Sequence, residues 1–261
     1  MSAPAAAKGT LYLVPTPLDH GCDTQSPLED VLPLGTIKAA AALTHWLSEN
    51  AKSTRAFLKR VDACVPLAQP VQALHISELP RAAHKKGDHA GAAPFDARPL
   101  LAPALQGTDI GLVSEAGMPA VADPGSSVVR AAHALGLEVV PLVGPVSPLL
   151  ALAASGLGGQ HFAFVGYLPQ EPEARARRIH ELEARALRGG QTQLFIETPY
   201  RNAALLRALL QTLQQGTRLA VSHGLTLDGG ATRSATVRDW RADTQAHAFA
   251  GDAPAIFAIG A

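Results

Sequence analysis

The chain has 261 residues, and its 22 basic and 22 acidic side chains give a formal net charge of zero at neutral pH. This balance excludes a basic nucleic-acid tail, and 47% apolar residues suffice for one large α/β domain or two compact ones. The two cysteines, Cys22 and Cys64, show no C-x-x-C or His/Cys ligand spacing, which argues against a disulfide framework and a structural zinc site. A protein of the reducing cytoplasm fits this composition.

Residues 1–8 are rich in alanine and proline, and we expect them to be disordered. They contain no apolar segment of signal-peptide length, and no uncharged apolar run in the chain reaches the ~18 residues of a membrane span. Secretion and membrane insertion are therefore not expected.

The first half of the chain predicts strands that lead into helices through short loops. Residues 10–14 and 108–114 are β-prone runs, and each ends in a loop that contains proline. After the second loop, Asp123-Pro124-Gly125 predicts an N-cap and a proline at the first helical position, followed by a helix over residues 126–135. Residues 137–142 predict the next strand, so a strand, a crossover helix and a strand imply parallel pairing.

The second half predicts another sheet after a domain boundary near Gly144. Ser147-Pro148 and Thr198-Pro199 each open a helix, the second directly behind a strand. Short β-prone runs recur at residues 162–167, 192–197, 217–222, 232–237 and 255–259. The sequence thus predicts two α/β domains, residues 9–144 with a mainly parallel sheet and residues 145–261 with a mixed sheet.

The loops at these strand ends are candidate ligand sites. In open parallel sheets, ligands bind outside the carboxyl ends of the strands, where helix N-termini present free amides. The same residues also fit ordinary strand-to-helix connections. Residues 80–99 have no hydrophobic periodicity and many small or polar side chains, which predicts a surface loop that is either a lid or slack.

Several familiar chemical signatures are absent from the sequence. No G-x-G-x-x-G follows the first strand and no P-loop pattern occurs, which argues against dehydrogenase and kinase chemistry. H-E-x-x-H, G-x-S-x-G and acidic calcium loops are also missing, and the ten histidines are scattered, so no metal is expected. A lone histidine is more typical of a surface or hydrogen-bonded side chain than of a ligand, and His20 is notable only because it follows the first loop.

Four segments resemble, in order and spacing, the tetrapyrrole-methylase superfamily of S-adenosylmethionine-dependent methyltransferases. They are LYLVPTPL, the long run that begins LVSEAGMPAVADPG, FAFVGYLP and QLFIETPYRN. Within the superfamily, the chain looks most like the branch of ribosomal RNA small subunit methyltransferase I, which methylates a cytidine ribose 2′-hydroxyl in 16S rRNA. The resemblance implies two α/β domains with the cofactor in a cleft between them, and a homodimer.

The resemblance also implies which residues bind S-adenosylmethionine. Gly117, Met118 and Val121 lie in a segment similar to the family's cofactor loop, whose main chain holds the methionine moiety. Residues 144–147 are similar to the next turn, and Glu197-Thr198 to the edge of the second domain near the adenine. The complete expected set is Pro17, Leu18, Gly117, Met118, Val121, Gly144, Val146, Ser147, Glu197, Thr198 and Pro254.

The chain departs from the family pattern where a substrate would lie. Thr16-Pro17-Leu18-Asp19-His20 stands where the family often has T-P-I-G-N, and residues 49–55 replace an E-D-T-R run. The family's D-A-G-T-P loop here reads E-A-G-M-P. The resemblance therefore points to the cofactor more directly than to the substrate.

Methyl transfer to a ribose is an in-line displacement in which the acceptor hydroxyl must also lose its proton. Glu49, at the end of a strand-like run over residues 45–48, is the candidate general base, with Lys52 and Arg55 placing a phosphate or stabilising the anion. These three residues equally fit a capped helix start with a charged face. Glu115 is a second candidate carboxylate and also fits a helix or loop cap.

Residues 171–187 predict a helix rich in alternating charges. Its arginines, followed by Arg188, alternate with Glu173, Glu181 and Glu183, which is typical of a solvated helix. The alternative is contact with RNA phosphates, helped by Arg201 and Arg207 in the next helix.

Three functions compete at this point. The first is a cytoplasmic S-adenosylmethionine-dependent methyltransferase that acts on RNA, most simply on 16S rRNA or the small ribosomal subunit. The second is a methyltransferase for a tetrapyrrole or another small molecule. The third is a regulatory protein that binds the cofactor without turnover. Basic groups around the site favour the first, and a wide apolar cleft favours the second.

Overall fold

The computed structural model describes residues 7–80, 95–244, 249 and 253–261. The chain divides into two compact units, of which the first comprises residues up to 21 and 25–146, and the second residues 22–24 and 147–261. Each unit is an α/β layer structure, which confirms the predicted fold class. The Lys8 ammonium donates to the Leu135 carbonyl at 2.7 Å. Most of the loop predicted at residues 80–99 lies outside the described residues.

The sheet of unit 1 has five strands in the order β3-β2-β4-β1-β5, and all of its pairings are parallel. The strands are β1 (Thr10–Val14), β2 (His45–Ser48), β3 (His75–Glu78), β4 (Ile110–Val113) and β5 (Glu138–Pro141). Parallel pairing requires long crossovers, and helices supply them on both faces of the sheet. The prediction of a mainly parallel first sheet is therefore confirmed.

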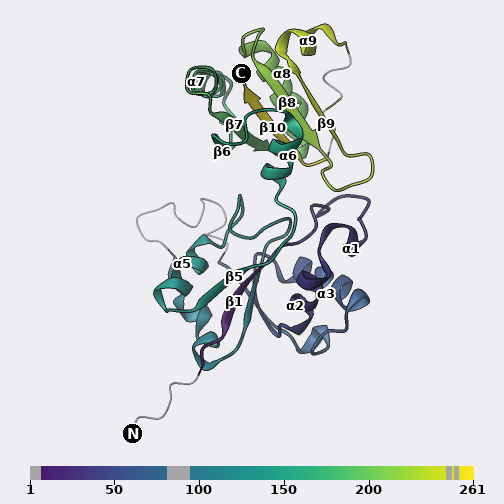
Figure 1. The fold of residues 1–261 in the computed structure, drawn as a ribbon, viewed down its shortest axis with the longest axis vertical. Helices are drawn as coiled ribbons and strands as arrows, with labels where there is room; N and C mark the ends of the chain where they lie inside the picture. Colours follow the sequence, from purple (N-terminus) through teal and green to yellow (C-terminus); the bar gives the residue numbers. More distant parts are fainter. Residues whose placement is uncertain (1–6, 81–94, 245–248, 250–252) are drawn as a thin grey trace. The chain divides into compact units, whose positions relative to one another are not determined.

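Helices cover both faces of this sheet because its central strands alternate their apolar side chains between two cores. In β4, Ile110 and Leu112 join the core under α5, whereas Val113 joins the core under α2 and α3. Figure 1 shows α5 on one side of the strands and α2 and α3 on the other. The helices on the side of α2 and α3 are α1 (Leu28–Val31), α2 (Leu34–Ala42), α3 (Ala51–Cys64) and the 3₁₀ helix η1 (Val71–Ala73). Those on the side of α5 are the 3₁₀ helices η2 (Arg98–Leu101) and η3 (Ala104–Gln106), together with α5 itself (Ser126–Ala134).

Two helix starts in unit 1 differ from the sequence prediction or decide between its alternatives. The prediction of Asp123 as an N-cap is wrong, since α5 begins only at Ser126 and Gly125 precedes it with a φ of 134°. At α3, the side chain of Asn50 accepts hydrogen bonds from the amides of Lys52 and Ser53. Residues 49–55 therefore contain a capped helix start, as one of the two alternatives proposed.

The sheet of unit 2 has the strand order β6-β7-β10-β8-β9 and is mixed, as predicted. β6 and β7 pair in parallel, and the other neighbours pair antiparallel. The strands are β6 (Phe162–Tyr167), β7 (Thr192–Glu197), β8 (Arg218–His223), β9 (Ala231–Thr236) and β10 (Ala255–Gly260). β10, the last segment of the chain, lies at the centre and is buried along its whole length.

One face of this second sheet carries most of the helices and the largest core. Trp240, Phe195 and Phe257 are fully buried there beneath α7 (Pro172–Gly189), α8 (Asn202–Thr212) and α9 (Val237–Ala242). α6 (Ser147–Ser155) covers a smaller core on the other face, and the 3₁₀ helix η4 (Pro199–Arg201) precedes α8. Within the described ranges, no helix is both long enough and apolar enough to cross a lipid bilayer.

The charged helix α7 is solvated on one side only. Exposed glutamates on the same helix pair with Arg177 and Arg178, which favours the solvated-helix alternative over phosphate binding. Glu183 departs from the predicted charged face, because its side chain is only 2% exposed. It accepts hydrogen bonds from the Thr217 hydroxyl at 2.5 Å and from the Gln214 amide at 2.7 Å. A buried carboxylate thus joins α7 to the turn before β8.

We expect Thr217→Val to lower the free energy of unfolding by about 1–3 kcal/mol, because it removes a donor from a buried charged acceptor without changing the side-chain shape. Urea denaturation measures this loss. The control is Thr232→Val, whose hydroxyl donates to the neutral Ser222 hydroxyl at 2.8 Å and should matter less. Equal losses in the two variants would contradict a special role for Glu183.

Candidate functional site

The loops that follow β1 and β4 turn to opposite faces of the first sheet. β1 leads to α1 on one face and β4 leads to α5 on the other, although the two strands are neighbours in the sheet. This divergence is the topological switch point, where open α/β sheets bind ligands beyond the carboxyl ends of their strands. The candidate site of unit 1 therefore lies at the ends of β1 and β4.

A pair of backbone hydrogen bonds joins the two diverging loops. Thr16 and Gly117 form an isolated antiparallel bridge, in which each amide donates to the carbonyl of the other at 3.0 Å. The Thr16 hydroxyl also donates to the Ser114 carbonyl at 3.3 Å. These bonds hold the β1 loop and the β4 loop in one fixed arrangement.

The loop that follows β5 contacts the same two loops. A side chain at Gly144 would place its Cβ 2.3 Å from Cγ of Pro15, and one at Gly117 would place its Cβ 3.1 Å from Leu18 and 3.5 Å from the Pro145 carbonyl. A Cβ at Gly144 would clash with Pro15, whereas at Gly117 the positive φ of 78° is the stronger reason for glycine. The expected cofactor residues Leu18, Gly117 and Gly144 thus belong to loops that contact one another.

The segment after Gly117 has an unusual backbone. Gly117, Ala120, Ala122 and Gly125 all have positive φ angles, of 78°, 64°, 66° and 134°. For the two alanines this conformation costs free energy, and such backbone strain is concentrated at functional sites in proteins. The segment that resembles a cofactor loop is therefore held in a shape that its sequence alone does not favour.

The resemblance implied that the main chain of this loop holds the methionine moiety, but the peptide groups of Gly117 are used within the protein. Both its N–H and its C=O bond to Thr16, so Gly117 fixes the loop through its main chain. Met118 and Val121, the next members of the expected set, line a mostly apolar groove of about 680 Å³ against Val129 and His133 of α5. The loop thus presents an apolar surface on the side of α5.

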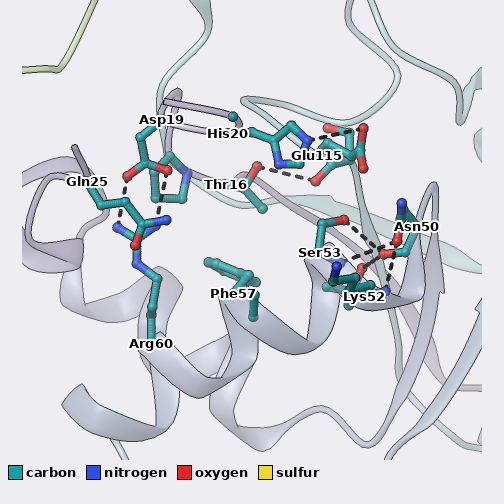
Figure 2. Close-up of a pocket in the computed structure, with 15 residues that line it drawn as sticks. Thr16, Asp19, His20, Gln25, Asn50, Lys52, Ser53, Phe57, Arg60 and Glu115 are labelled. Carbon is teal, nitrogen blue, oxygen red and sulfur yellow. Dashed lines mark hydrogen bonds and ion pairs between the residues drawn. The ribbon is translucent and has the colours of Figure 1, made fainter. Parts of the chain in front are cut away.

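A polar cavity of about 410 Å³ lies on the other side of the bridge, between the β1 loop, the β4 loop and the start of α3. Figure 2 shows Asp19, His20 and Glu115 at its upper edge and Asn50, Lys52 and Arg60 around α3. The remaining lining residues are Thr16, Pro17, Gly21, Gln25, Ser53, Thr54, Ala56, Phe57 and Ser114.

A buried ion pair fixes one wall of this cavity. Asp19 is 3% exposed, and its carboxylate accepts two hydrogen bonds from the Arg60 guanidinium at 3.0 and 3.1 Å. Arg60 also donates to the Ser26 carbonyl at 2.7 Å. A bidentate pair of this kind fixes orientation as well as distance. It anchors the whole β1 loop to α3.

A histidine and a carboxylate line the same cavity beside the Asp19–Arg60 pair (Figure 2). His20 Nε2 lies 3.5 Å from Glu115 Oε2, and both side chains are partly exposed. Lys52, in the first turn of α3, lines the same cavity with its exposed side chain. The cavity therefore combines a histidine–carboxylate pair with a cation.

The predicted catalytic residues separate in the structure. Glu115 and Lys52 line the polar cavity, whereas Glu49 and Arg55 are not among its lining residues. The Arg55 guanidinium donates to the Ala51 carbonyl on its own helix at 3.4 Å. The negative charge of Glu49 instead raises the pKa of Asp123, the residue predicted to be a helix cap.

Asp123 has an altered acidity. Burial, the largest cause, and the negative charges of Glu49 and Glu115 together raise the pKa of its carboxyl to about 7, although a hydrogen bond from Ser114 opposes the shift. Three carboxylates thus gather at the ends of β2 and β4. The sequence could not signal this cluster, because it depends on which strand ends are neighbours.

Three expected cofactor residues of unit 2, Glu197, Thr198 and Pro254, lie where the inner strand β7 ends and the inner strand β10 begins. Glu197 ends β7 and pairs in register with Ala255, which follows Pro254. The Glu197 carboxylate accepts from the Thr198 amide at 2.8 Å and pairs with Arg201 at 2.7 Å. Because Arg201 is neutralised in this way, its predicted role in phosphate binding is weakened.

Two remaining members of the expected set, Val146 and Ser147, stand where the two units are divided. Val146 is the last residue of unit 1, and Ser147 begins α6 in unit 2. The division therefore falls two residues after the predicted boundary.

Comparison with known proteins adds a family to this geometry. Residues 37–240 match the tetrapyrrole (corrin/porphyrin) methylases, a span that includes most of both units. The chain belongs to this family. Methyl transfer is thus the chemistry of the family, and the switch-point loops of unit 1 are the candidate site for it.

Curated relatives in this family carry one common name. The chain is 33% identical to "Ribosomal RNA small subunit methyltransferase I" of Mesorhizobium japonicum over 87% of its length and 67% of the relative's. It is 32% identical to the protein of that name from Xylella fastidiosa, over 82% of this chain and 67% of the relative. It is 30% identical to the protein of that name from Escherichia coli O157:H7, over 84% of this chain and 66% of the relative. The matched part of the chain thus spans about two thirds of these relatives.

Solved structures of the family share the fold. A uroporphyrin-III-C-methyltransferase from Thermus thermophilus aligns with a TM-score of 0.51, covering 97% of this chain and 92% of that one. The methyltransferase CobJ aligns with a TM-score of 0.57, covering 97% and 94%. Both are 19% identical in sequence, so they support the two-sheet methylase fold.

The raised pKa of Asp123 makes the stability of the methylase depend on pH. The native state retains a proton that the unfolded state loses above about pH 4, so this residue's contribution falls as pH rises from about 4 to about 7. Asp123→Asn should remove this dependence and stabilise the protein by about 1–3 kcal/mol at pH 8, with little change at pH 4. Urea denaturation at several pH values measures both effects.

The control for this pH series is Asp228→Asn, which alters an exposed carboxylate in unit 2. It should leave the pH dependence of stability as in the wild type. A wild-type-like slope in the Asp123→Asn protein would show that Asp123 does not hold the extra proton.

Gly117→Val should weaken binding of S-adenosylhomocysteine by about 10-fold or more, because its side chain would displace Leu18 and the Pro145 carbonyl, and the loops that meet there would separate. Isothermal titration calorimetry measures the dissociation constant. Gly229→Val is the matched control, since Gly229 has the same φ of 78° but no atom within 4 Å of its Cβ position. It should lose stability and keep its affinity. Equal affinities in the two variants would place the ligand elsewhere.

Proposed function

We propose that this protein transfers the methyl group of S-adenosylmethionine to a ribose 2′-hydroxyl of 16S rRNA in the small ribosomal subunit. The observation that carries the proposal is the shared name of the curated relatives, which match more than four fifths of the chain at 30–33% identity. The polar cavity at the switch point of unit 1 supports it, because a ribose-phosphate backbone needs polar partners. A homodimer in the cytoplasm is part of the same proposal.

In unit 1, the residues proposed to hold the methyl donor lie in loops that contact one another. Gly144 brings the loop after β5 closer to Pro15 than any side chain would allow, and the strained segment 118–122 follows Gly117. Because Thr16 uses both peptide groups of Gly117, the zwitterionic amino-acid group of the donor would hydrogen-bond to other peptide groups of these loops. When bound, S-adenosylmethionine supplies an electrophilic methyl group on sulfur. Glu197, Thr198 and Pro254 of unit 2 are proposed as further contacts on the resemblance alone.

The polar cavity favours RNA over the alternative small-molecule acceptors. Its lining is mostly hydroxyl, amide and charged side chains, with Lys52 available to a phosphate. A tetrapyrrole would require a broad apolar surface, and among the described residues of unit 1 the groove beside α5 offers one, whereas Phe57 is the one large apolar side chain that lines this cavity. The overall charge of zero means that RNA affinity must come from local groups such as these.

The proposal is tested by methyl transfer with purified protein. Small ribosomal subunits from a strain that lacks the gene are incubated with radiolabelled S-adenosylmethionine, and ribose methylation is mapped by resistance to alkaline cleavage. We expect one labelled 2′-O-methyl position in 16S rRNA, and none in large subunits. Subunits from the parent strain, in which the position is already methylated, are the matched control. Label in uroporphyrinogen III but not in RNA would contradict the proposal.

A further inference from the structure

We propose that the polar cavity of unit 1 receives the acceptor nucleotide and that His20 is the base that removes the proton from the acceptor hydroxyl. Glu115 acts as the positioning residue of His20, and Lys52 binds the adjacent phosphate. This inference rests on the proposed function and identifies the acceptor side of the same site. It replaces Glu49 as the candidate base.

The position of His20 follows from the bridge between the loops. Thr16 lines the cavity and bonds to Gly117, the first residue of the segment expected to hold the methyl donor. His20 lies four residues after Thr16, and Glu115 lies two residues before Gly117. The histidine–carboxylate pair is thus tied to the same two strand ends as the donor loop. A base must lie within hydrogen-bond reach of the acceptor, and this arrangement places His20 beyond the carboxyl ends of β1 and β4, near the donor loop.

The charged groups that face the cavity come from three elements. The β1 loop supplies Asp19 and His20, α3 supplies Lys52 and Arg60, and the β4 loop supplies Glu115. Asp19 and Arg60 neutralise each other in a bidentate pair, so they form a fixed wall. The groups that remain for an acceptor are the His20–Glu115 pair and the Lys52 ammonium.

The proton transfer balances with the displacement. The acceptor O–H bond breaks and its proton passes to the imidazole of His20, while an oxygen lone pair forms a bond to the methyl carbon. The carbon–sulfur bond breaks and its electron pair stays on sulfur, which gives S-adenosylhomocysteine and a 2′-O-methyl ribose. The Glu115 carboxylate, 3.5 Å from Nε2, stabilises the imidazolium until it releases the proton to water.

Glu49 is poorly placed for the same step. It is not among the residues that line the polar cavity, and its charge acts on the buried Asp123.

The main test is single-turnover methyl transfer to small ribosomal subunits, measured between about pH 5.5 and 8.5. His20→Ala should lower the rate by about 10²-fold or more at neutral pH and lose the rise with pH that a histidine base produces. Added imidazole should restore part of the rate. His180→Ala, which removes an exposed histidine of α7, is the matched control and should behave as the wild type.

Glu115→Gln separates positioning from folding. Loss of the carboxylate should lower the rate less than His20→Ala does, because the imidazole is still present, and the rate should still rise with pH. Affinity for S-adenosylhomocysteine, measured by calorimetry, should remain within about 3-fold of the wild type in all these variants. A full-rate His20→Ala enzyme with an unchanged pH profile would overturn the assignment.

A second measurement does not depend on turnover. Binding of a mixed-sequence RNA hexanucleotide is measured for the wild type, for Lys52→Ala and for Lys59→Ala, an exposed α3 lysine that does not line the cavity. We expect only Lys52→Ala to weaken binding, by about 5-fold or more, and we expect the hexanucleotide to shift the NMR signals of His20. Equal affinities and unshifted signals would refute the acceptor site. Absence of methyl transfer by the wild type, with RNA binding intact, would instead refute the proposed function.

Discussion

The arrangement of the candidate site depends on two backbone hydrogen bonds between Thr16 and Gly117. They join loops that leave neighbouring strands toward opposite faces of the sheet, so without them the two loops would diverge. The bridge also uses the peptide groups of Gly117, which explains why a glycine with positive φ is needed there. Every side chain of the proposed acceptor cavity is placed relative to this bridge.

Electrostatics then divides the surroundings of the bridge into fixed and adjustable groups. The buried Asp19–Arg60 pair is satisfied within the protein, and breaking it would leave an uncompensated charge. The His20–Glu115 pair is partly exposed, and its Nε2 and Oε2 atoms lie 3.5 Å apart. Asp123 lies between these cases, since burial and neighbouring carboxylates weaken its acidity. A buried ion pair and a partly exposed histidine–carboxylate pair thus line one cavity.

Most secondary structure was predictable because each element has a local signal. Runs of β-branched and apolar residues gave the strands, and proline after a hydroxyl residue marked the starts of the helices near Ser147 and Thr198. The same local rules failed at Asp123, where a proline follows a good cap but the chain makes a strained turn first. They also failed at Glu183, because helical spacing does not reveal that a turn of the chain covers that position.

By itself, the sequence determined the two α/β units, the mixed second sheet and the family, because these follow from hydrophobic patterns and short motifs. It did not determine which side chains share the cavity. Arg60 and Asp19 are 41 residues apart and Thr16 and Ser114 are 98 apart, and no local pattern links such partners. Only the strand order β2-β4-β1 brings their loops together. The tertiary structure therefore decided the catalytic candidates, since proton transfer depends on distances that chain position does not encode.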